Sequence, residues 1–185
     1  VFTLTSLSSA AEFNQDRLLN VSSRTQVGTG LDMPVVGFVV GPGPAKNVLI
    51  RAVGPGLSSF GVSGVIADPK IDVYDGAGKL VSSNDNWTTT TIGSATAFAN
   101  VGAFNLTSGS KDAALQLTLA PGAYTAQVSG VGTATGVALM EVYDVSGTAK
   151  LMNLSTRAKA GTGAGILITG ITVAPGAGRR QILVR

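Results

Sequence analysis

Five side chains near the middle of the chain could bind a metal ion. Asp72 and Asp75 lie shortly before a polar run that contains Asn84, Asp85 and Asn86. Calcium takes about six to eight oxygen ligands, often from Asp, Asn and loop carbonyls. The same residue types are common in tight turns, where their side chains bond to their own backbone. The spacing therefore predicts either a calcium site at Asp72, Asp75, Asn84 and Asp85 or polar turns at the same positions.

The rest of the composition excludes most catalytic chemistry. The 185 residues include no cysteine and no histidine, so thiol nucleophiles, disulfides, Ser-His-Asp triads and imidazole bases are excluded. The glycine-rich triplet at 28–30 is not followed by the helix that a dinucleotide site requires. We therefore expect a protein that is not an enzyme and that holds no cofactor, with calcium as the one exception.

Charge and composition indicate the surroundings of the protein. Residues 150–185 carry six basic and no acidic side chains, within a net charge of +3, but no aromatic residues lie among the bases as in single-stranded nucleic-acid sites. No apolar run reaches the roughly 20 residues of a membrane span. We expect no nucleic acid and no membrane span. A chain rich in Ser and Thr and poor in Glu is typical of secreted β proteins, which favours an extracellular or cell-surface location.

Four Asn-X-Ser/Thr triplets would accept glycans in a secreted chain. Sequences rich in Asn, Ser and Thr also produce such triplets by chance. The candidate acceptors are Asn20, Asn86, Asn105 and Asn153.

The chain contains an internal repeat. Residues 17–51 and 150–185 align at an offset of 133, which becomes 134 after one inserted residue near Arg180. We expect three parts: an N-terminal strand and linker (1–16), one complete repeat (17–149) and the opening strands of a second (150–185). Those opening strands need a sheet to join, in the same or a neighbouring subunit. The recurring arginines suggest ion pairs or contacts between repeats, or solvated strand positions. The matched positions include Asn20 and Asn153, Arg24 and Arg157, Gly28-Thr29-Gly30 and Gly161-Thr162-Gly163, Gly37 and Gly170, Pro42 and Pro175, and Arg51 and Arg185.

Short β-rich runs separated by Gly and Pro predict an all-β fold, a β-sandwich of the jelly-roll or immunoglobulin-like kind. Alternation within 123–129 assigns Tyr124, Ala126 and Val128 to the core, and one helical turn is expected within 94–100. The expected strands are 2–5, 17–23, 35–40, 47–52, 71–74, 80–83, 113–119, 123–129, 136–143, 151–156, 166–173 and 181–184.

The N-terminal strand lies outside the repeat. Phe2 and Leu4 alternate with polar residues before a polar linker. Such a strand can fold onto its own sheet or be donated to a neighbour, where main-chain hydrogen bonds and apolar side chains provide binding. The opening strands of the second repeat offer the same opportunity. The expected assembly residues are Phe2, Leu4, Ile166, Ile168, Ile171 and Val173.

Long motifs resemble known modules. The strings NVSSRTQVGTG, VLIRAVGPGLSSFGVSG and NLSTRAKAGTG are similar to a tandem β-sandwich module of very large secreted or surface proteins of environmental bacteria. The stretch from KIDVYDGAGKLVSSNDNW through APGAYTAQVSG resembles the bacterial pre-peptidase C-terminal domain, a jelly-roll accessory module. The resemblance covers 17–185. It implies an extracellular, non-catalytic role in adhesion, cell-surface structure or substrate contact.

The sequence therefore predicts an extracellular structural subunit that self-associates head to tail by strand complementation, as a homo-oligomer or a filament. The alternative is a non-catalytic binding or adhesion module, for carbohydrate or protein, of a larger secreted protein. Carbohydrate sites usually present exposed aromatic rings, and the chain has one tryptophan and three tyrosines, which weighs against the sugar-binding alternative.

Overall fold

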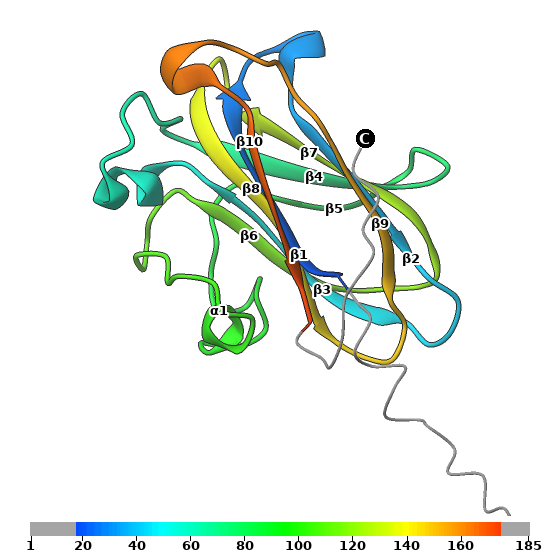
Figure 1. Ribbon diagram of the computed structural model, residues 1–185. Coiled ribbons are helices and arrows are strands. Elements are labelled where there is room, and N and C mark those ends of the chain that lie inside the picture. The colour runs from blue at the N-terminus through cyan, green and yellow to red at the C-terminus, as the bar shows by residue number, and fades with distance from the viewer. Residues whose placement is uncertain (1–17, 175–185) are drawn as a thin grey trace, which may run out of the picture.

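The protein is a β-sandwich of two five-stranded antiparallel sheets, seen in a computed structural model that describes residues 18–174 (Figure 1). The predicted all-β sandwich is confirmed, whereas the expected strands 2–5 and 181–184 lie outside the described residues. Sheet A has the order β10 (Ile168–Val173), β1 (Leu18–Val27), β8 (Gly136–Ser146), β3 (Lys46–Val53) and β6 (Ala113–Leu119). Sheet B has the order β5 (Leu80–Asn84), β4 (Pro69–Asp75), β7 (Gly122–Gly130), β2 (Val35–Val40) and β9 (Leu151–Arg157).

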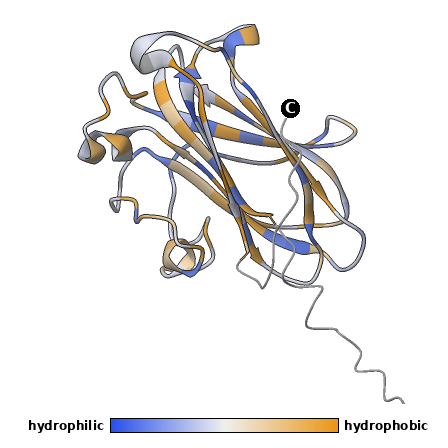
Figure 2. Cartoon of the chain, in the orientation of Figure 1, coloured by the Kyte–Doolittle hydropathy of each residue, from blue (hydrophilic) through white to orange (hydrophobic). Residues whose placement is uncertain are grey.

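The main core lies between the two sheets. Hydrophobic and hydrophilic residues alternate along the strands (Figure 2), and the hydrophobic ones on the inward faces form this core. Ala126 and Val128 are buried as predicted, and Tyr124 packs against the same core from a half-buried position. The Tyr124 ring stacks on Phe38, with the ring centroids 5.6 Å apart. Burial of each large aliphatic side chain contributes about 1.5–3 kcal/mol, so this core stabilises the packing of sheet A on sheet B.

A second apolar cluster covers the outer face of sheet A. Phe98 in α1 (Ala97–Asn100) and Leu57 in the 3₁₀ helix η3 (Pro55–Phe60) pack there against Leu49 and Val137. The expected helical turn at 94–100 is confirmed, and η3 is an additional short helix that the sequence did not predict. Proline at its first turn and Gly61 in the left-handed region (φ +74°) begin and end this helix.

Buried charges lie beneath this cluster. The Arg51 side chain is fully buried, with Nε 2.8 Å from Glu141 Oε2 and Nη1 donating to the Phe104 carbonyl at 2.6 Å. Its guanidinium lies 4.9 Å from the Phe98 ring centroid and 4.4 Å from that of Phe104. One of the recurring arginines therefore forms a structural ion pair, as the repeat suggested. Lys46 Nζ lies 2.6 Å from Asp144 Oδ1 in a second buried pair.

Candidate assembly interface

The two described strands of the second copy extend the two sheets at one end of the sandwich. In sequence, β9 corresponds to β1 and β10 corresponds to β2. In the structure, β10 pairs with β1 in sheet A and β9 pairs with β2 in sheet B. The second copy is therefore joined to the first within the same chain. The second strand of one copy pairs with the first strand of the other copy in both sheets.

The registers of these two pairings are equivalent. Val35 lies opposite Arg157, and Arg24 lies opposite Ile168. Because Arg157 is the counterpart of Arg24 and Ile168 that of Val35, exchanging the two copies reproduces the same contact. Both pairings also have an irregularity at the same place, next to Leu18 in β1 and next to Leu151 in β9. The two copies are thus related by an approximate two-fold axis.

The turns that follow β1 and β9 share one conformation. Gly28 N donates to the Asp32 carbonyl at 3.2 Å, and Gly161 N donates to the Gly165 carbonyl at 3.1 Å. Gly30 begins the 3₁₀ helix η2 (Gly30–Asp32) with φ +59°. Its counterpart begins η4 (Gly163–Gly165) with φ +56°. The described part of the second copy, residues 150–174, therefore keeps the local fold of the first.

Side chains meet at the axis itself. Ser23 Oγ and Thr156 Oγ1 are 2.9 Å apart, and these residues occupy the same position in the two copies, 133 residues apart. A Cβ at Gly37 would lie 2.7 Å from Ser155 Oγ, and one at Gly170 would lie 3.0 Å from Ser22 Oγ. The same close approach on both sides of the axis explains why both copies have glycine at this position.

The outer edges distinguish the two copies. β1 and β2 are each covered on their other edge, by β8 and β7. Among the described residues, β9 and β10 have no second neighbouring strand. Asn20 is buried whereas its counterpart Asn153 is exposed, and Phe38 is buried whereas its counterpart Ile171 is 44% exposed. Among the described residues, the second copy thus presents two opening strands whose outer edges have no neighbouring strand.

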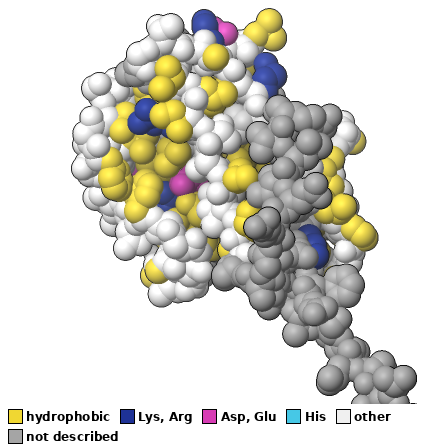
Figure 3. All heavy atoms as spheres, in the orientation of Figure 1, with side chains coloured by type: hydrophobic (Ala, Val, Ile, Leu, Met, Phe, Trp, Pro, Cys, Tyr) yellow, Lys and Arg dark blue, Asp and Glu magenta, His cyan; other side chains and the backbone are white. Residues whose placement is uncertain are grey.

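The predicted assembly residues lie at this open end where they are described. Ile166, Ile168 and Ile171 are exposed large aliphatic side chains, and Val173 is half-buried. Met152, with 63% exposure, adds to them and was missed, because it lies in the irregularity between β9 and β2 that sequence alternation does not reveal. Hydrophobic side chains are visible over sheet A in Figure 3, where the grey residues 1–17 and 175–185 are not described. Phe2 and Leu4 lie outside the described residues.

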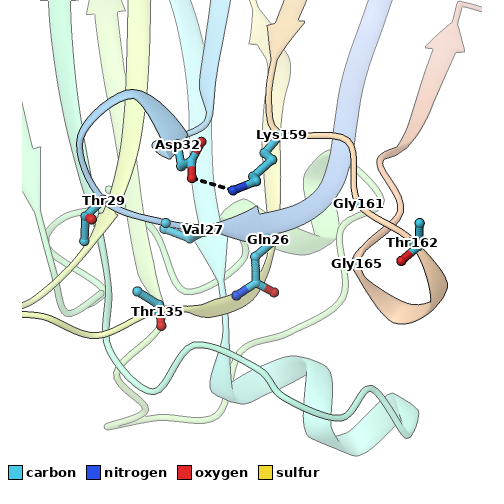
Figure 4. A pocket seen from close by; sticks show the side chains of 10 residues that line it. Gln26, Val27, Thr29, Asp32, Thr135, Lys159, Gly161, Thr162 and Gly165 are labelled. Carbon is cyan, nitrogen blue, oxygen red and sulfur yellow. Dashed lines mark hydrogen bonds and ion pairs between the residues drawn. The ribbon is translucent and has the colours of Figure 1, made fainter.

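A pocket of about 390 Å³ lies between the two glycine-rich turns. Asp32 and Lys159 point toward each other across it, with Lys159 Nζ 2.7 Å from Asp32 Oδ2, while Gln26 and Thr135 lie on the other side of the β1 ribbon (Figure 4). Both partners of this ion pair are about half exposed, so water screens the pair and its contribution is small.

Arg157, one of the recurring arginines, donates from Nη1 to the Leu31 carbonyl at 3.2 Å, so it makes a contact between the copies.

Three of the four residues of the predicted calcium site, Asp72, Asp75 and Asn84, form hydrogen bonds in or beside the β4–β5 hairpin. Asp75 Oδ1 accepts from the backbone N–H of Ala77 at 3.0 Å and of Lys79 at 2.9 Å. Asp72 Oδ1 accepts from Ser83 Oγ at 2.6 Å, and Asn84 Oδ1 accepts from a backbone N–H of β6. Residues 18–174 contain no group of three or more acidic side chains placed to hold a metal ion. The hydrogen bonds of Asp72, Asp75 and Asn84 are those of the polar-turn alternative.

The four candidate glycan acceptors differ in exposure. Asn86, Asn105 and Asn153 are exposed. Asn20 is buried, and its Nδ2 donates to the carbonyls of Val21 and Val142. A glycan on Asn20 is incompatible with this packing, so three acceptors remain.

Two ionisable groups outside the interface have altered proton affinity. Burial raises the pKa of the Tyr143 hydroxyl above its ordinary value. The charge of Glu141 adds to the shift, as does the hydrogen bond that the hydroxyl donates to Glu141 Oε1 at 2.7 Å. The hydrogen bond and charge of Asp68 raise the pKa of Lys111 at the surface. Tyr143 packs in the outer cluster of sheet A, so neither group belongs to the open end.

No family model matches the chain, and no curated protein is similar to it. Among the described residues, no helix is both long and apolar enough to cross a bilayer.

Proposed function

We propose that the chain is an extracellular structural subunit that self-associates head to tail through β-strand complementation, as a homo-oligomer or a filament. The observation that carries this proposal is the open end of the sandwich. There, β9 and β10 expose aliphatic side chains whose counterparts in β1 and β2 are buried or half-buried. Strand edges with free backbone groups and adjacent apolar side chains readily accept another strand.

The placement outside the cell rests on composition and on the resemblance to secreted repeat modules. A non-catalytic role rests on the lack of histidine and cysteine. The apolar side chains at the open end support association with protein rather than with sugar, because aliphatic groups on a strand edge pack against another sheet. The exposed large side chains that support this are Met152, Ile166, Ile168 and Ile171.

The test compares the purified chain with a variant that carries Ile168→Lys and Ile171→Lys. Both side chains are about half exposed, so the charges alter the interface while the fold persists. We expect the unaltered chain to form larger species as its concentration rises, by light scattering after size-exclusion chromatography and by negative-stain microscopy. The variant should remain a monomer.

Val131→Lys is the matched control, because Val131 has a similar exposure of 40% but lies between β7 and β8 and not in β9 or β10. It should assemble like the unaltered chain. A monomeric unaltered chain, or equal assembly of the double-lysine variant, would contradict the proposal and favour a binding module. Deleting residues 1–13 separately tests donation by Phe2 and Leu4.

A further inference from the structure

We infer that the open end of β9 and β10 fits a further sandwich body of the same sequence, residues 52–149 without opening strands of its own, which would place a β8 strand against β9 and a β7 strand against β10. This inference rests on the proposed role of β9 and β10 in strand complementation. It names the partner and the register of the contact.

The internal repeat identifies the partner. The outer edge of β9, which has no neighbour among the described strands, corresponds to the edge of β1 that β8 covers, and the outer edge of β10 corresponds to the edge of β2 that β7 covers. The two copies also share their turns and their mutual register. An edge that has the backbone conformation of β1 and β2 is shaped for the strands that cover β1 and β2 in the first copy.

The side chains of the second copy keep the corresponding pattern. On the inward face of β9, Leu154 and Thr156 are half-buried where Val21 and Ser23 in β1 are buried. In β10, Ile171 is exposed at the position where Phe38 packs in the core. A second body would cover these positions and turn each strand edge into the interior of a sandwich.

The registers of the first copy fix those of the second. Arg24 lies opposite Leu139, so Arg157 should lie opposite Leu139 of the second body. Val35 lies opposite Gln127, so Ile168 should lie opposite Gln127 of the second body. The resulting pair of sandwiches is related by the two-fold axis between the copies. Each open end therefore takes one body.

The experiment joins a second copy of residues 52–149 directly after Arg185. This junction keeps the repeat in phase, because Arg185 aligns with Arg51. We expect hydrogen exchange of the β9 and β10 amides to slow to the level of β1 and β2. Exchange of these amides at the rate seen in the 185-residue chain, or failure of the added residues to fold, would overturn the inference.

A cysteine pair tests the register independently, since the chain has no cysteine of its own. Ile168→Cys with Gln127→Cys in the added copy should form a disulfide, because opposed residues of antiparallel strands lie about 4.5–5.5 Å apart at Cα. Ile168→Cys with Thr125→Cys in the added copy is the control. In this control the two cysteines lie on the same face of the sheet but two residues out of register, about 7–8 Å apart. They should therefore remain reduced. A disulfide in the control alone would refute the proposed register.

The two proposals can fail separately. If the 185-residue chain assembles but β9 and β10 stay unprotected in the extended chain, strand complementation stands and this partner is wrong. The acceptor would then be sought at the opposite end of the sandwich, where Leu80 and Val81 of the edge strand β5 are exposed. If the 185-residue chain is monomeric but the extended chain protects β9 and β10, the partner is right and self-association is wrong.

Discussion

Removing the negative charge beside Arg51 should destabilise the protein strongly. Glu141→Gln keeps the shape of the side chain and an acceptor for the Tyr143 hydroxyl, but it leaves the guanidinium buried without its carboxylate. Arg51 has no exposed side-chain surface, so water cannot replace the lost partner. Breaking a buried pair in this way costs about 3–5 kcal/mol. At about 2–4 °C for each kcal/mol in a domain of this size, Tm should fall by roughly 6–20 °C.

Urea unfolding measures this loss directly. Trp87 is the single tryptophan, and its ring lies 5.3 Å from Phe98, one of the two rings beside the Arg51 guanidinium. Its fluorescence should therefore report the region around the altered pair, with circular dichroism following the sheets. The control is the double variant Arg51→Met with Glu141→Gln, which removes both charges, keeps an acceptor for the Tyr143 hydroxyl and should recover much of the stability. A loss below about 1 kcal/mol in Glu141→Gln, within the range of exposed ion pairs, would refute the reasoning, because it would mean that water reaches the guanidinium.

Three further predictions concern the body of the sandwich. Because the folded state raises the pKa of Tyr143 above its ordinary value of 10.0, it holds the phenol proton more tightly than the unfolded state. Stability should therefore be intact below that value and fall as pH rises above it, and Tyr143→Phe should lessen the fall in unfolding experiments across this range. Asp112→Ala should cost about 2–6 kcal/mol by urea unfolding, because the buried carboxylate accepts two backbone N–H groups and each buried donor left unpaired costs about 1–3 kcal/mol; an effect below 1 kcal/mol would contradict this. Gly136→Ala should lower Tm clearly, since Gly136 has φ +150° and a Cβ would lie 2.5 Å from a backbone nitrogen, whereas Gly76→Ala, with no contact closer than 3.5 Å, should have little effect.

The sequence predicted the strands well because they alternate and are separated by Gly and Pro. The sequence also predicted the second copy, because residues that match in the two copies form the same turns in the structure. It could not decide whether β9 and β10 would join the same chain. Alternation assigns the face of a strand but not its neighbour, which depends on contacts far apart in the chain.

The outer cluster of sheet A was the main omission. Residues of β8 face two cores, so Met140 and Val137 are both buried although they lie on opposite faces of the strand. The segment between β3 and β6 that covers this face has no clear period. Buried Lys46 and Arg51 were equally hard to locate, because a charged residue in a strand is usually solvated and its burial depends on partners such as Asp144 and Glu141.

Differences between the copies determine which opening strands belong to the first body. The core of the first copy has Val36 and Phe38 where the second has Thr169 and Ile171, and Phe38 stacks on Tyr124. Placing β10 in the position of β2 would move the Thr169 hydroxyl from its contact with Ser23 into an apolar core, and burying a hydroxyl costs about 1–3 kcal/mol where no hydrogen bond compensates. It would also lose the ring contact, at about 0.5–1.5 kcal/mol. These costs keep β1 and β2 on their own body. Completion of the second copy therefore requires a body whose own opening strands are not in place, and the chain extended after Arg185 meets this condition.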